Sequence, residues 1–407
     1  MKILYYGSAC EKEWFDKISK EKNLLPFNVA QYNFEMALLD GIAQIDNVDM
    51  KIYYLPQESY YPKGSLFKKV KKAMLNLKYS VSHMFVWNLP LAKELLMFFQ
   101  GMYLTLVWAL MNIGEKDKYI LTPFNYPPLS LGVLIVSKLF NIKRVNIFTD
   151  LSNDILGTDR QNDMVWVKRK ILPIYKNVVK KIDQSYDYYI LFTKAMNDVV
   201  NPHNRPFIVM EGIYNNNLDL TYKSKEKALM YAGTLSYEYG IKNIINAFDK
   251  IEDKDLQLWL FGSGDMKKDI EELSVKNPRI KYFGFMPRED VFEYEKKASL
   301  LINIRNPNDR YTKYSFPSKT FEYMVSGTPF LTTKLEGIPD EYYNYLFTLN
   351  DFDIDVLKTK IEEIFSKDQQ ELDHFGEQAR QFILLQKGSL NQARKIMNLI
   401  TIKGEGK

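Results

Sequence analysis

The sequence predicts an α/β protein of two doubly wound domains, each a parallel sheet with helices on both faces. A chain of 407 residues is too long for one ordinary core. Short apolar runs alternate with helical stretches, a rhythm typical of parallel strands joined by helices. The rhythm stops at the polar stretch 215–227 and then restarts, which indicates two Rossmann-like domains.

The predicted strands are apolar runs such as ILYY and YYILF, which suit parallel strands covered on both faces. In the first half we expect strands at Lys2–Tyr6, Met50–Leu55, Lys118–Thr122, Val145–Thr149, Tyr188–Thr193 and Pro206–Met210. In the second half we expect them at Ala228–Ala232, Leu256–Phe261, Ile280–Phe283, Leu300–Ile304, Pro329–Thr333 and Tyr345–Leu349. The stretch Gln370–Ile400 is predicted to be helical.

These elements predict a first domain over residues 1–215 and a second over 216–385. Residues 386–407 are expected to form a helix that packs back on the first domain, followed by a tail. Because open parallel sheets bind ligands at the carboxyl ends of their strands, we expect the chemistry in a cleft between the two domains.

Cysteine and histidine are too scarce for a disulfide or a metal cluster. The only cysteine is Cys10, which suits a reducing compartment, and the three histidines are His83, His203 and His374. We therefore expect no metal. The opening MKILYYGSAC has no apolar stretch of signal-peptide length, which predicts a cytoplasmic protein.

Basic residues concentrate in the first half, where residues 1–210 hold 27 Lys and Arg against 19 Asp and Glu. Two runs, 63–78 and 168–181, each contain six Lys or Arg and no acid. The simplest interpretation of both runs is solvated helix surface. The alternative is a surface that meets an anionic partner.

Leu95–Gly114 is an uncharged apolar block that is long enough to span a bilayer at about 20 residues. Gln100, Thr105 and Asn112 interrupt it. A buried core helix is the favoured interpretation, and a helix partly inserted in the membrane interface or a true span are the alternatives. Beside the lysines of 63–78, the block suggests peripheral attachment to anionic lipid on the inner face of the plasma membrane.

Two glycine turns follow predicted strands. Gly233 ends the first strand of the second half, and Gly262 and Gly264 follow the next one. A glycine lets backbone approach a ligand, and a helix N-terminus offers free N–H groups to an anion. A plain tight turn explains each equally well. Phe285, after the third strand, can stack on a flat base or form a buried hydrophobic turn.

The segment FPSKTFEYMVSG predicts a short helix that begins near Pro317 and stops at Gly327. Ser318, Lys319 and Glu322 share one neighbourhood at spacings of three and four residues.

A carboxylate at position 322 can accept two hydrogen bonds from a ribose diol. Lys319, the helix N-terminus and Arg305 can meet a phosphate. The alternative is an amphipathic helix with an intrahelical Lys–Glu pair.

Residues 228–335 resemble the nucleotide-sugar domain of GT-B glycosyltransferases. The resemblance lies in the order of four motifs: Gly-x-Leu…Gly-Ile, Phe-Gly-x-Gly, Gly-Phe and FPSKTFEYMVSGTPFL. The most similar group is glycosyltransferase family 4, especially its bacterial surface-polysaccharide members. The resemblance implies that Glu322 binds the nucleotide ribose. It implies further donor-binding residues at Gly233, Thr234, Lys242, Gly262, Gly264, Phe285, Tyr314 and Ser318, with Arg305 and Lys319 at the diphosphate.

The chain departs from the family pattern at the donor sugar and at the phosphates. Family members usually carry Glu-x7-Glu, and the first glutamate falls on Tyr314 here. Thr234 and Tyr239 stand where the family has basic residues. Arg305 with Lys242 or Lys319 is expected to supply the missing positive charge, because a diphosphate leaving group needs cations or N–H groups.

In the first half, Gly7 and Ser8 lie where the family has its acceptor-side glycine loop, and Asp150 ends a predicted strand. Asp150 can orient or deprotonate an acceptor hydroxyl, or cap the next helix, with Asp154 four residues on.

His83 and His203 are interpreted as surface or packing residues without a catalytic partner. The Asp351–Asp355 run is interpreted as a solvated helix cap rather than a metal site.

The resemblance implies a metal-independent, retaining hexosyltransferase. It would move a sugar from a nucleotide-diphosphate donor to a glycan or lipid-linked acceptor in capsule or exopolysaccharide synthesis, with no nucleic-acid partner. The alternative is a non-catalytic GT-B partner that stabilises or positions another transferase. An isomerase on this scaffold would need more general-base residues than the chain supplies.

Overall fold

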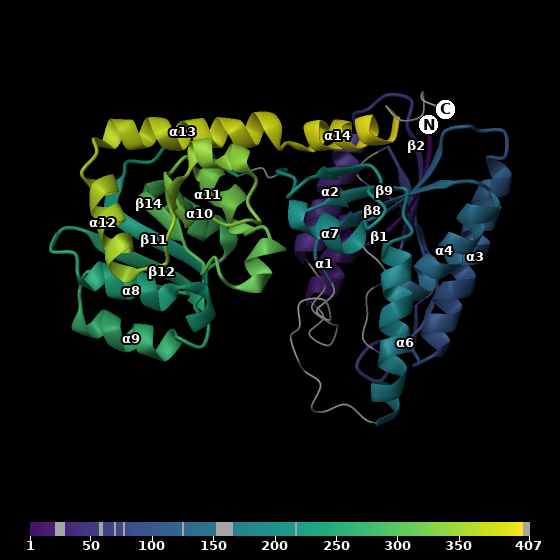
Figure 1. The fold of residues 1–407 in the computed structure, drawn as a ribbon, viewed down its shortest axis with the longest axis horizontal. Coiled ribbons are helices and arrows are strands. Elements are labelled where there is room, and N and C mark those ends of the chain that lie inside the picture. Colours follow the sequence, from purple (N-terminus) through teal and green to yellow (C-terminus); the bar gives the residue numbers. More distant parts are fainter. Residues whose placement is uncertain are drawn as a thin grey trace. The chain divides into compact units, whose positions relative to one another are not determined.

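The computed structural model describes residues 1–20, 29–56, 60–68, 71–75, 78–123, 126–151, 166–215 and 218–401. The chain divides into two compact units (Figure 1). Unit 1 comprises Met1–Ile213 together with Ser389–Lys407, and unit 2 comprises Tyr214–Gly388. Each unit is described by itself.

Unit 1 contains an eight-stranded sheet with the order β10-β9-β8-β7-β1-β2-β5-β4. All neighbouring strands are parallel except β4 and β5. The strands are β1 (Lys2–Gly7), β2 (Asp49–Tyr54), β4 (Lys72–Met74), β5 (Ser80–His83), β7 (Lys118–Thr122), β8 (Lys143–Phe148), β9 (Tyr188–Leu191) and β10 (Phe207–Val209). The helices are α1 (Lys12–Lys20), α2 (Val29–Ala43), α3 (Ala92–Met111), α4 (Pro127–Leu139), α6 (Trp166–Asp183), α7 (Asn197–Val200) and α14 (Ser389–Thr401).

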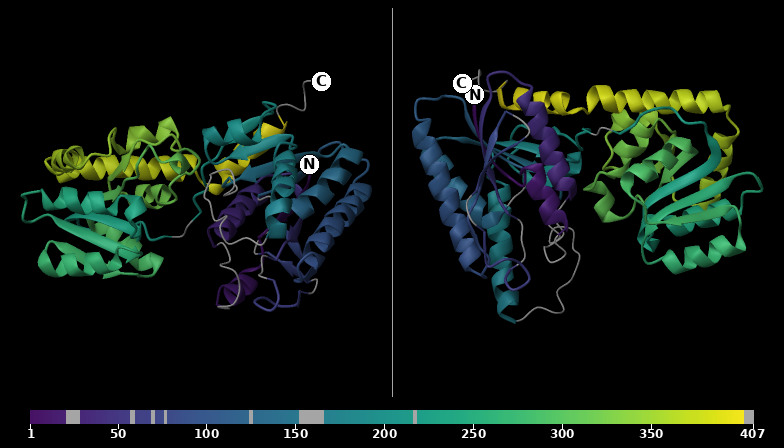
Figure 2. Two further views of the ribbon diagram at one scale, coloured as in Figure 1. Left: turned by 60° about the horizontal axis from the view of Figure 1, so that its bottom comes forward. Right: turned by 180° about the vertical axis from the view of Figure 1, so that it is seen from behind.

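Strand β1 divides the core of unit 1 into two layers because its side chains alternate between the faces of the sheet. Ile3 and Tyr5 pack in a cluster with residues of α2 and α14. Leu4 and Tyr6 pack in a second cluster with residues of α3 and α4. Both faces of the sheet are therefore covered by helices (Figures 1 and 2), as the continuous apolar run of β1 predicts.

Unit 2 contains a six-stranded sheet with the order β13-β12-β11-β14-β15-β16, in which every pair is parallel. The strands are β11 (Glu226–Thr234), β12 (Gln257–Ser263), β13 (Ile280–Gly284), β14 (Ala298–Asn303), β15 (Phe330–Thr333) and β16 (Phe347–Leu349). Strand order reverses between β11 and β14, which is where doubly wound sheets open a crevice for ligands.

The helices of unit 2 cover both faces of this sheet. They are α8 (Ile241–Asp249), α9 (Lys267–Lys276), α10 (Arg288–Lys297), α11 (Lys319–Ser326), α12 (Ile354–Phe365) and α13 (Gln369–Gln386). Leu229 and Tyr231 of β11 pack with α8, α9 and α12. Met230 and Ala232 pack with α10, α11 and α13.

The twelve predicted strands are all present, within about two residues at most of their ends. One expectation about another segment is wrong. The basic run 63–78 contains the short strands β3 (Phe67–Lys68) and β4 rather than a helix, and β3 pairs with β6 (Val86–Trp87). Gln370–Ile400 is helical as predicted, and it is divided into two helices because α13 ends at Gln386 and α14 begins at Ser389.

The apolar block 95–114 forms most of α3, and the favoured interpretation of a buried core helix is wrong. One face of α3, including Met97, Thr105 and Trp108, is buried against the sheet and α4. The opposite face is exposed. By length and composition α3 is also the one helix among the described residues that is apolar enough to cross a membrane.

Candidate functional site

The carboxyl ends of four neighbouring parallel strands bring most of the predicted donor residues to one edge of the unit 2 sheet. Thr234 ends β11, Ser263 ends β12, Gly284 ends β13 and Asn303 ends β14. Thr234 is exposed, as is Lys242 at the start of α8. This edge includes the point where strand order reverses, which is where open α/β sheets commonly bind ligands.

Gly262 and Gly264 are required by packing within this edge. Gly262 has φ +123, and a Cβ there would lie 1.8 Å from the carbonyl oxygen of Gly233, its partner in β11. A Cβ on Gly264 would lie 2.1 Å from the carbonyl oxygen of Leu235. Close approach of two backbones therefore accounts for both glycines.

Phe285 follows β13 directly and is 83 % exposed. The alternative of a buried hydrophobic turn is wrong for this side chain. An exposed aromatic ring at the carboxyl edge of a sheet can stack on a flat ligand.

Arg305 lies two residues beyond β14, and its guanidinium stacks on two tyrosine rings. The centroids of Tyr239 and Tyr311 lie 5.2 Å and 5.8 Å from its Cζ. Its Nε is buried without a hydrogen-bond partner, and Arg305 is in none of the ion pairs among the described residues. A cation held by aromatic rings rather than by a carboxylate keeps its donors available for an anion. Tyr239 replaces a basic residue of the family pattern, and its ring contacts the basic residue Arg305.

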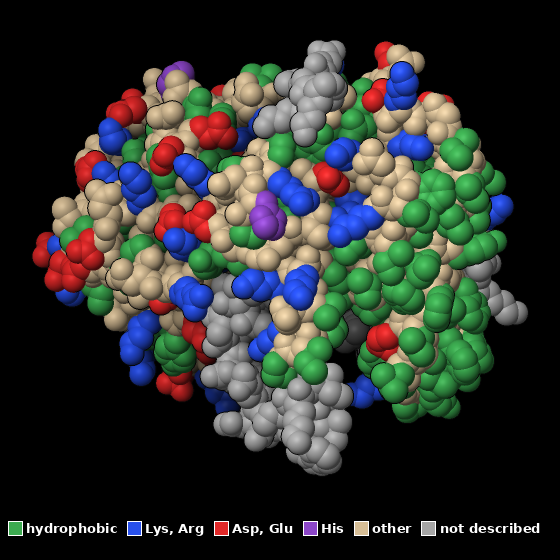
Figure 3. Space-filling model, turned by 45° about the vertical axis from the view of Figure 1, so that its right-hand side comes forward, with side chains coloured by type: hydrophobic (Ala, Val, Ile, Leu, Met, Phe, Trp, Pro, Cys, Tyr) green, Lys and Arg blue, Asp and Glu red, His purple; other side chains and the backbone are tan. Residues whose placement is uncertain are grey.

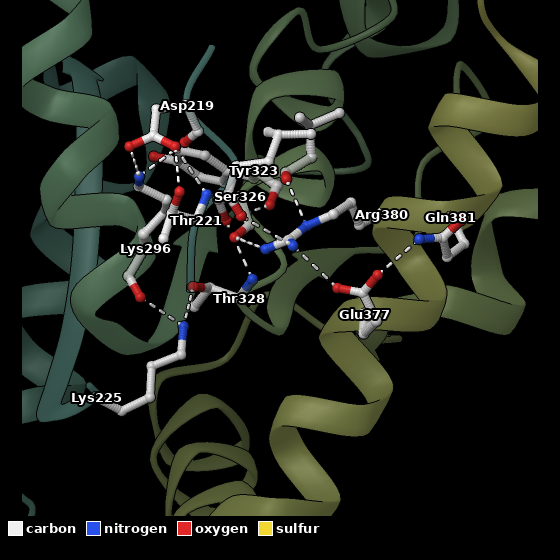
Figure 4. Close-up of polar contacts among 12 residues, drawn as sticks. Asp219, Thr221, Lys225, Lys296, Tyr323, Ser326, Thr328, Glu377, Arg380 and Gln381 are labelled. Atoms are coloured by element: carbon white, nitrogen blue, oxygen red, sulfur yellow. Dashed lines mark hydrogen bonds and ion pairs between the residues drawn. The ribbon is translucent and has the colours of Figure 1, made fainter. Parts of the chain in front are cut away.

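Helix α11 is tied to strand β11 and to helix α13. The Tyr323 hydroxyl accepts a hydrogen bond from the Ala232 amide (2.8 Å) and donates one to the Ala232 carbonyl (3.2 Å), which ties the helix to β11. From α13, Arg380 donates from Nε to the Val325 carbonyl (3.0 Å) and from Nη2 to the Ser326 carbonyl (2.7 Å) at the C-terminal end of α11. Figure 4 shows Arg380 beside Ser326. The helix stops at Gly327, which has φ +73, as predicted.

The N-terminus of α11 presents Lys319 and Glu322 together. Lys319 Nζ donates to Glu322 Oε1 at 3.0 Å, so the predicted i,i+3 pair is present. Ser318 is the exposed N-cap and makes no side-chain capping hydrogen bond, and Pro317 lies one residue before it rather than inside the first turn.

Arg288, the first residue of α10, is a member of this cluster that sequence reasoning missed. Its Nε donates to Glu322 Oε2 at 2.9 Å. The Glu322 side chain is only 10 % exposed and lies between the two cations. Burial alone would raise the pKa of Glu322, but Lys319 and Arg288 outweigh it and hold that pKa below its usual value. Glu322 is therefore an ionised carboxylate at neutral pH.

Glu295 of α10 lies beneath this pair and was also missed. Its side chain is fully buried, and both of its carboxyl oxygens are without a hydrogen-bond partner. Lys319 Nζ lies 3.7 Å from Glu295 Oε1. Burial and the neighbouring Glu322 carboxylate raise the pKa of Glu295 well above its usual range. With Glu295 neutral, Arg288, Lys319 and Glu322 carry one net positive charge, which favours an anionic ligand.

Tyr314 ends a 3-10 turn over Arg310–Lys313, and its ring lies 5.8 Å from Lys313 Nζ. The structure thus places a half-buried aromatic side chain where the family pattern has its first glutamate.

In unit 1, the loop after β1 is tied down by a buried carboxylate. Glu35 Oε2 accepts hydrogen bonds from the Ser8 amide (2.6 Å), the Ala9 amide (3.1 Å) and the Tyr5 hydroxyl (2.8 Å). A Cβ on Gly7 would lie 2.2 Å from the same oxygen. Glu35 of α2 therefore occupies two backbone amides of the loop that is predicted to lie on the acceptor side.

His83 is buried, as the packing interpretation predicts, and it pairs with a carboxylate. Its Nε2 lies 2.8 Å from Glu11 Oε2, and Lys71 Nζ pairs with the other oxygen of Glu11 at 2.5 Å. His83 is buried, and burial lowers its pKa, although the Glu11 carboxylate offsets part of that effect.

Two further acidic sites complete the predicted set. Asp150 is exposed and follows β8, while Asp154 lies outside the described residues. Asp353 is the N-cap of α12 and accepts from the amides of Asp355 and Val356, as predicted. Among the residues that the structure describes, no group of three His, Cys, Asp or Glu side chains could hold a metal ion.

Residues 218–382 match the model of the family described as glycosyl transferases, group 1. A curated relative, an uncharacterized glycosyltransferase of Methanocaldococcus jannaschii, is 27 % identical over 119 residues. That match covers 28 % of each protein.

Solved structures are similar over nearly the whole chain. Sucrose-phosphate synthase from Thermosynechococcus elongatus has a TM-score of 0.56 at 15 % identity and covers 100 % of both chains. Anabaena HepE in complex with UDP has a TM-score of 0.57 at 14 % identity, and the lipopolysaccharide outer core galactosyltransferase WaaB has a TM-score of 0.58 at 12 % identity. Each of these two matches covers 99 % of this chain and 100 % of the other chain. The chain thus has the GT-B fold, residues 218–382 match the group 1 glycosyl transferase model, and the predicted resemblance is confirmed at that level.

Proposed function

We propose that this protein is a retaining, metal-independent hexosyltransferase of the family 4 type. It moves a sugar from a nucleotide-diphosphate donor to a glycan or lipid-linked acceptor in the synthesis of a bacterial surface polysaccharide, in the cytoplasm. The observation that carries the proposal is the ionised Glu322 at the start of α11, flanked by cations, in the domain that matches group 1 glycosyl transferases.

Glu322 binds the ribose of the donor. Arg288 and Lys319 each use one lone pair on a different carboxylate oxygen, and each oxygen keeps another for a ribose hydroxyl. Arg288 and Lys319 also fix the orientation of the carboxylate, so little conformational freedom is lost when the diol binds. Phe285 lies at the same strand edge for contact with the base.

Arg305 stabilises the diphosphate as it leaves. Negative charge grows on the departing phosphate oxygen, and a guanidinium without a carboxylate partner can donate to it directly. The acceptor oxygen bonds to the anomeric carbon on the face from which the diphosphate leaves, as the bond to the phosphate oxygen breaks. The departing phosphate oxygen takes the proton of the acceptor hydroxyl, so the step needs no enzyme nucleophile. Asp150 orients the acceptor hydroxyl, with Gly7 and Ser8 on the acceptor side of the site.

The test is nucleotide binding by purified protein. A thermal-shift panel of UDP-, GDP-, ADP- and CMP-sugars identifies the donor, because a ligand that binds only the folded state raises the melting temperature. UDP is the first choice, since a solved protein of the same fold is in complex with UDP.

Glu322→Ala should weaken binding of the identified nucleotide about 10- to 100-fold by calorimetry, the loss expected for hydrogen bonds to a charged group. Glu272→Gln, an exposed change on α9, is the matched control and should leave the affinity unchanged. Equal affinity of Glu322→Ala and wild type for every nucleotide diphosphate would refute the role of Glu322.

A non-catalytic GT-B partner protein is the second candidate function. Tyr314 and Thr234 favour it, because they replace residues that the family pattern uses for the donor sugar and phosphate. Transfer or hydrolysis from a nucleotide sugar by the purified protein alone would exclude this candidate. Nucleotide binding without either reaction, also in the presence of acceptor lipid or glycan, would favour it.

A further inference from the structure

We propose that one face of unit 1, formed by α3, α4 and α6, binds the surface of an anionic lipid bilayer without spanning it. This inference concerns where the protein sits and does not depend on the donor site. It gives the apolar block 95–114 and the lysine run 168–181 a common physical role.

Helix α3 has an exposed apolar stripe. Leu95, Phe99 and Tyr103, spaced at four residues, are 60 %, 59 % and 65 % exposed, and Leu110 continues the stripe. Residues at this spacing lie on one side of a helix. Four large apolar side chains on one helix face form a patch rather than the scattered apolar exposure of an ordinary surface.

The stripe continues onto neighbouring helices. Helix α4 packs on α3 and exposes Ile135 and Leu139, and α6 packs on α4 and exposes Ile174 and Val178. Figure 3 shows apolar side chains gathered over this side of the molecule. The face is therefore broad enough to lie against a surface rather than to hold a single small ligand.

The charges on these three helices are nearly all positive. Together their sequences contain eight Lys or Arg, of which Lys93 is buried, and two acids, Glu94 and Asp183. Lys180 and Lys181 are exposed at the end of α6, and the Glu94 carboxylate accepts a hydrogen bond from Tyr60. Apolar side chains with adjacent lysines complement a bilayer with anionic headgroups. A second copy of the same face would bring like charges together.

The packing of α3 rules against a span. A Cβ on Gly132 of α4 would lie 2.3 Å from the Phe98 carbonyl oxygen of α3, so the two backbones touch at this glycine. The Thr105 and Tyr6 hydroxyls are 3.0 Å apart and hydrogen-bonded, which links α3 to β1. Crossing a bilayer would require α3 to leave these contacts and expose the core of unit 1.

Aromatic side chains lie beside the face, where a bilayer interface would favour them. Phe67 and Trp87 are exposed and stacked, with ring centroids 6.0 Å apart, on the paired strands β3 and β6. Gln100 of α3 donates to the Phe85 carbonyl at 2.7 Å and so holds this ribbon against the helix.

The test is co-sedimentation of the full chain with large vesicles of phosphatidylcholine, alone or with one quarter phosphatidylglycerol. Wild type should bind the anionic vesicles, and binding should fall as salt is raised. The triple variant Leu95→Ser, Phe99→Ser, Tyr103→Ser and the double variant Lys180→Glu, Lys181→Glu should each lower binding at least about tenfold. The matched control is Val275→Ser on α9, which changes an apolar side chain that is 86 % exposed on unit 2.

A site-specific probe separates insertion from general adhesion. Cys10 is buried and is the only cysteine, so an environment-sensitive dye can be placed on Phe99→Cys or Val275→Cys. Only the dye at position 99 should shift to the blue with anionic vesicles. Vesicle binding that is the same in the face variants and in wild type would overturn the proposal. The proposal would also be overturned if wild type did not bind lipid and formed a dimer, while the triple variant was a monomer.

Discussion

At the scale of single residues, Glu35 shows how a buried carboxylate can organise a loop. It has no exposed surface, and two consecutive loop amides and the Tyr5 hydroxyl donate to one of its oxygens. Burial raises its pKa to about 7 in spite of these hydrogen bonds. The loop that carries Gly7 and Ser8 is thus coupled to a group that titrates near neutral pH.

This coupling predicts a pH dependence of stability. The folded pKa of Glu35 is about 7 against 4.5 for a free glutamate, so folding binds a proton between these values. The stabilisation is complete below about pH 4.5 and is lost as pH rises through about 7, a change of about 3 kcal/mol. Urea unfolding of wild type and Glu35→Gln, measured from pH 4.5 to 8, should show this fall only in wild type. If the free energy of unfolding changed with pH in the same way in wild type and Glu35→Gln, the prediction would be contradicted.

Sequence spacing could predict only the local part of the donor site. Lys319 and Glu322 form an ion pair because they are three residues apart on one helix. This contact could be predicted once the helix was predicted. Arg288 and Glu322 are 34 residues apart, and Ser8 and Glu35 are 27 apart. Such pairs depend on how helices are packed on a sheet, which no residue spacing reveals. The Gly-Phe turn after β13 did point to the region, since Arg288 lies three residues beyond Phe285.

At the scale of elements, α3 and α4 are held together by glycine. Gly132 allows α4 to approach the α3 backbone, and an alanine there would put its Cβ 2.3 Å from the Phe98 carbonyl oxygen. Because both groups are backbone, the strain cannot be relieved by a side-chain rotation. Gly132→Ala should therefore destabilise unit 1 by about 1–3 kcal/mol.

The control is Gly114→Ala, where a Cβ would meet nothing within 4 Å. Thermal unfolding by circular dichroism should show a clear loss for Gly132→Ala and a change within about 0.5 kcal/mol for Gly114→Ala. Equal melting temperatures for the two variants would show that the helices can separate without cost. The close packing argued for α3 would then fail, and a membrane span would regain support.

Elements were predictable where the apolar pattern was continuous. Strands such as β1, β8 and β14 are runs of almost entirely buried residues, and burial on both faces makes such runs stand out. Strands β3 to β6 were not predicted because they are two to four residues long and partly lysine-rich. Their pairing depends on neighbouring segments rather than on an apolar pattern of their own. The same lysines led to the wrong prediction of a helix surface. The exposed stripe of α3 has the apolar composition of a protein core, which led to the wrong prediction of a buried helix.

At the scale of the whole molecule, the chain leaves unit 1 after Ile213 and returns to it at Ser389. The returning helix α14 completes the first core: Ala393, Ile396 and Ile400 are buried in the cluster that holds α2. The Tyr119 hydroxyl of β7 donates to the Ile400 carbonyl at 3.1 Å, and Gln392 Nε2 donates to the Gly212 carbonyl at 2.7 Å. Unit 1 is therefore complete only when the last helix is in place.

This arrangement predicts that a change near the C-terminus destabilises the N-terminal unit. Ile396→Ala removes a fully buried side chain and should cost about 2–5 kcal/mol, because a cavity remains in a close-packed core. The loss should appear in unit 1, as faster hydrogen exchange in β1, α2 and β10, while β11 to β16 of unit 2 keep their protection. Leu385→Ala, an exposed leucine on the preceding helix α13, is the matched control and should leave both units unchanged. If exchange instead accelerated only in unit 2, α14 would belong to the core of unit 2, and the division of the chain at Ser389 would be wrong.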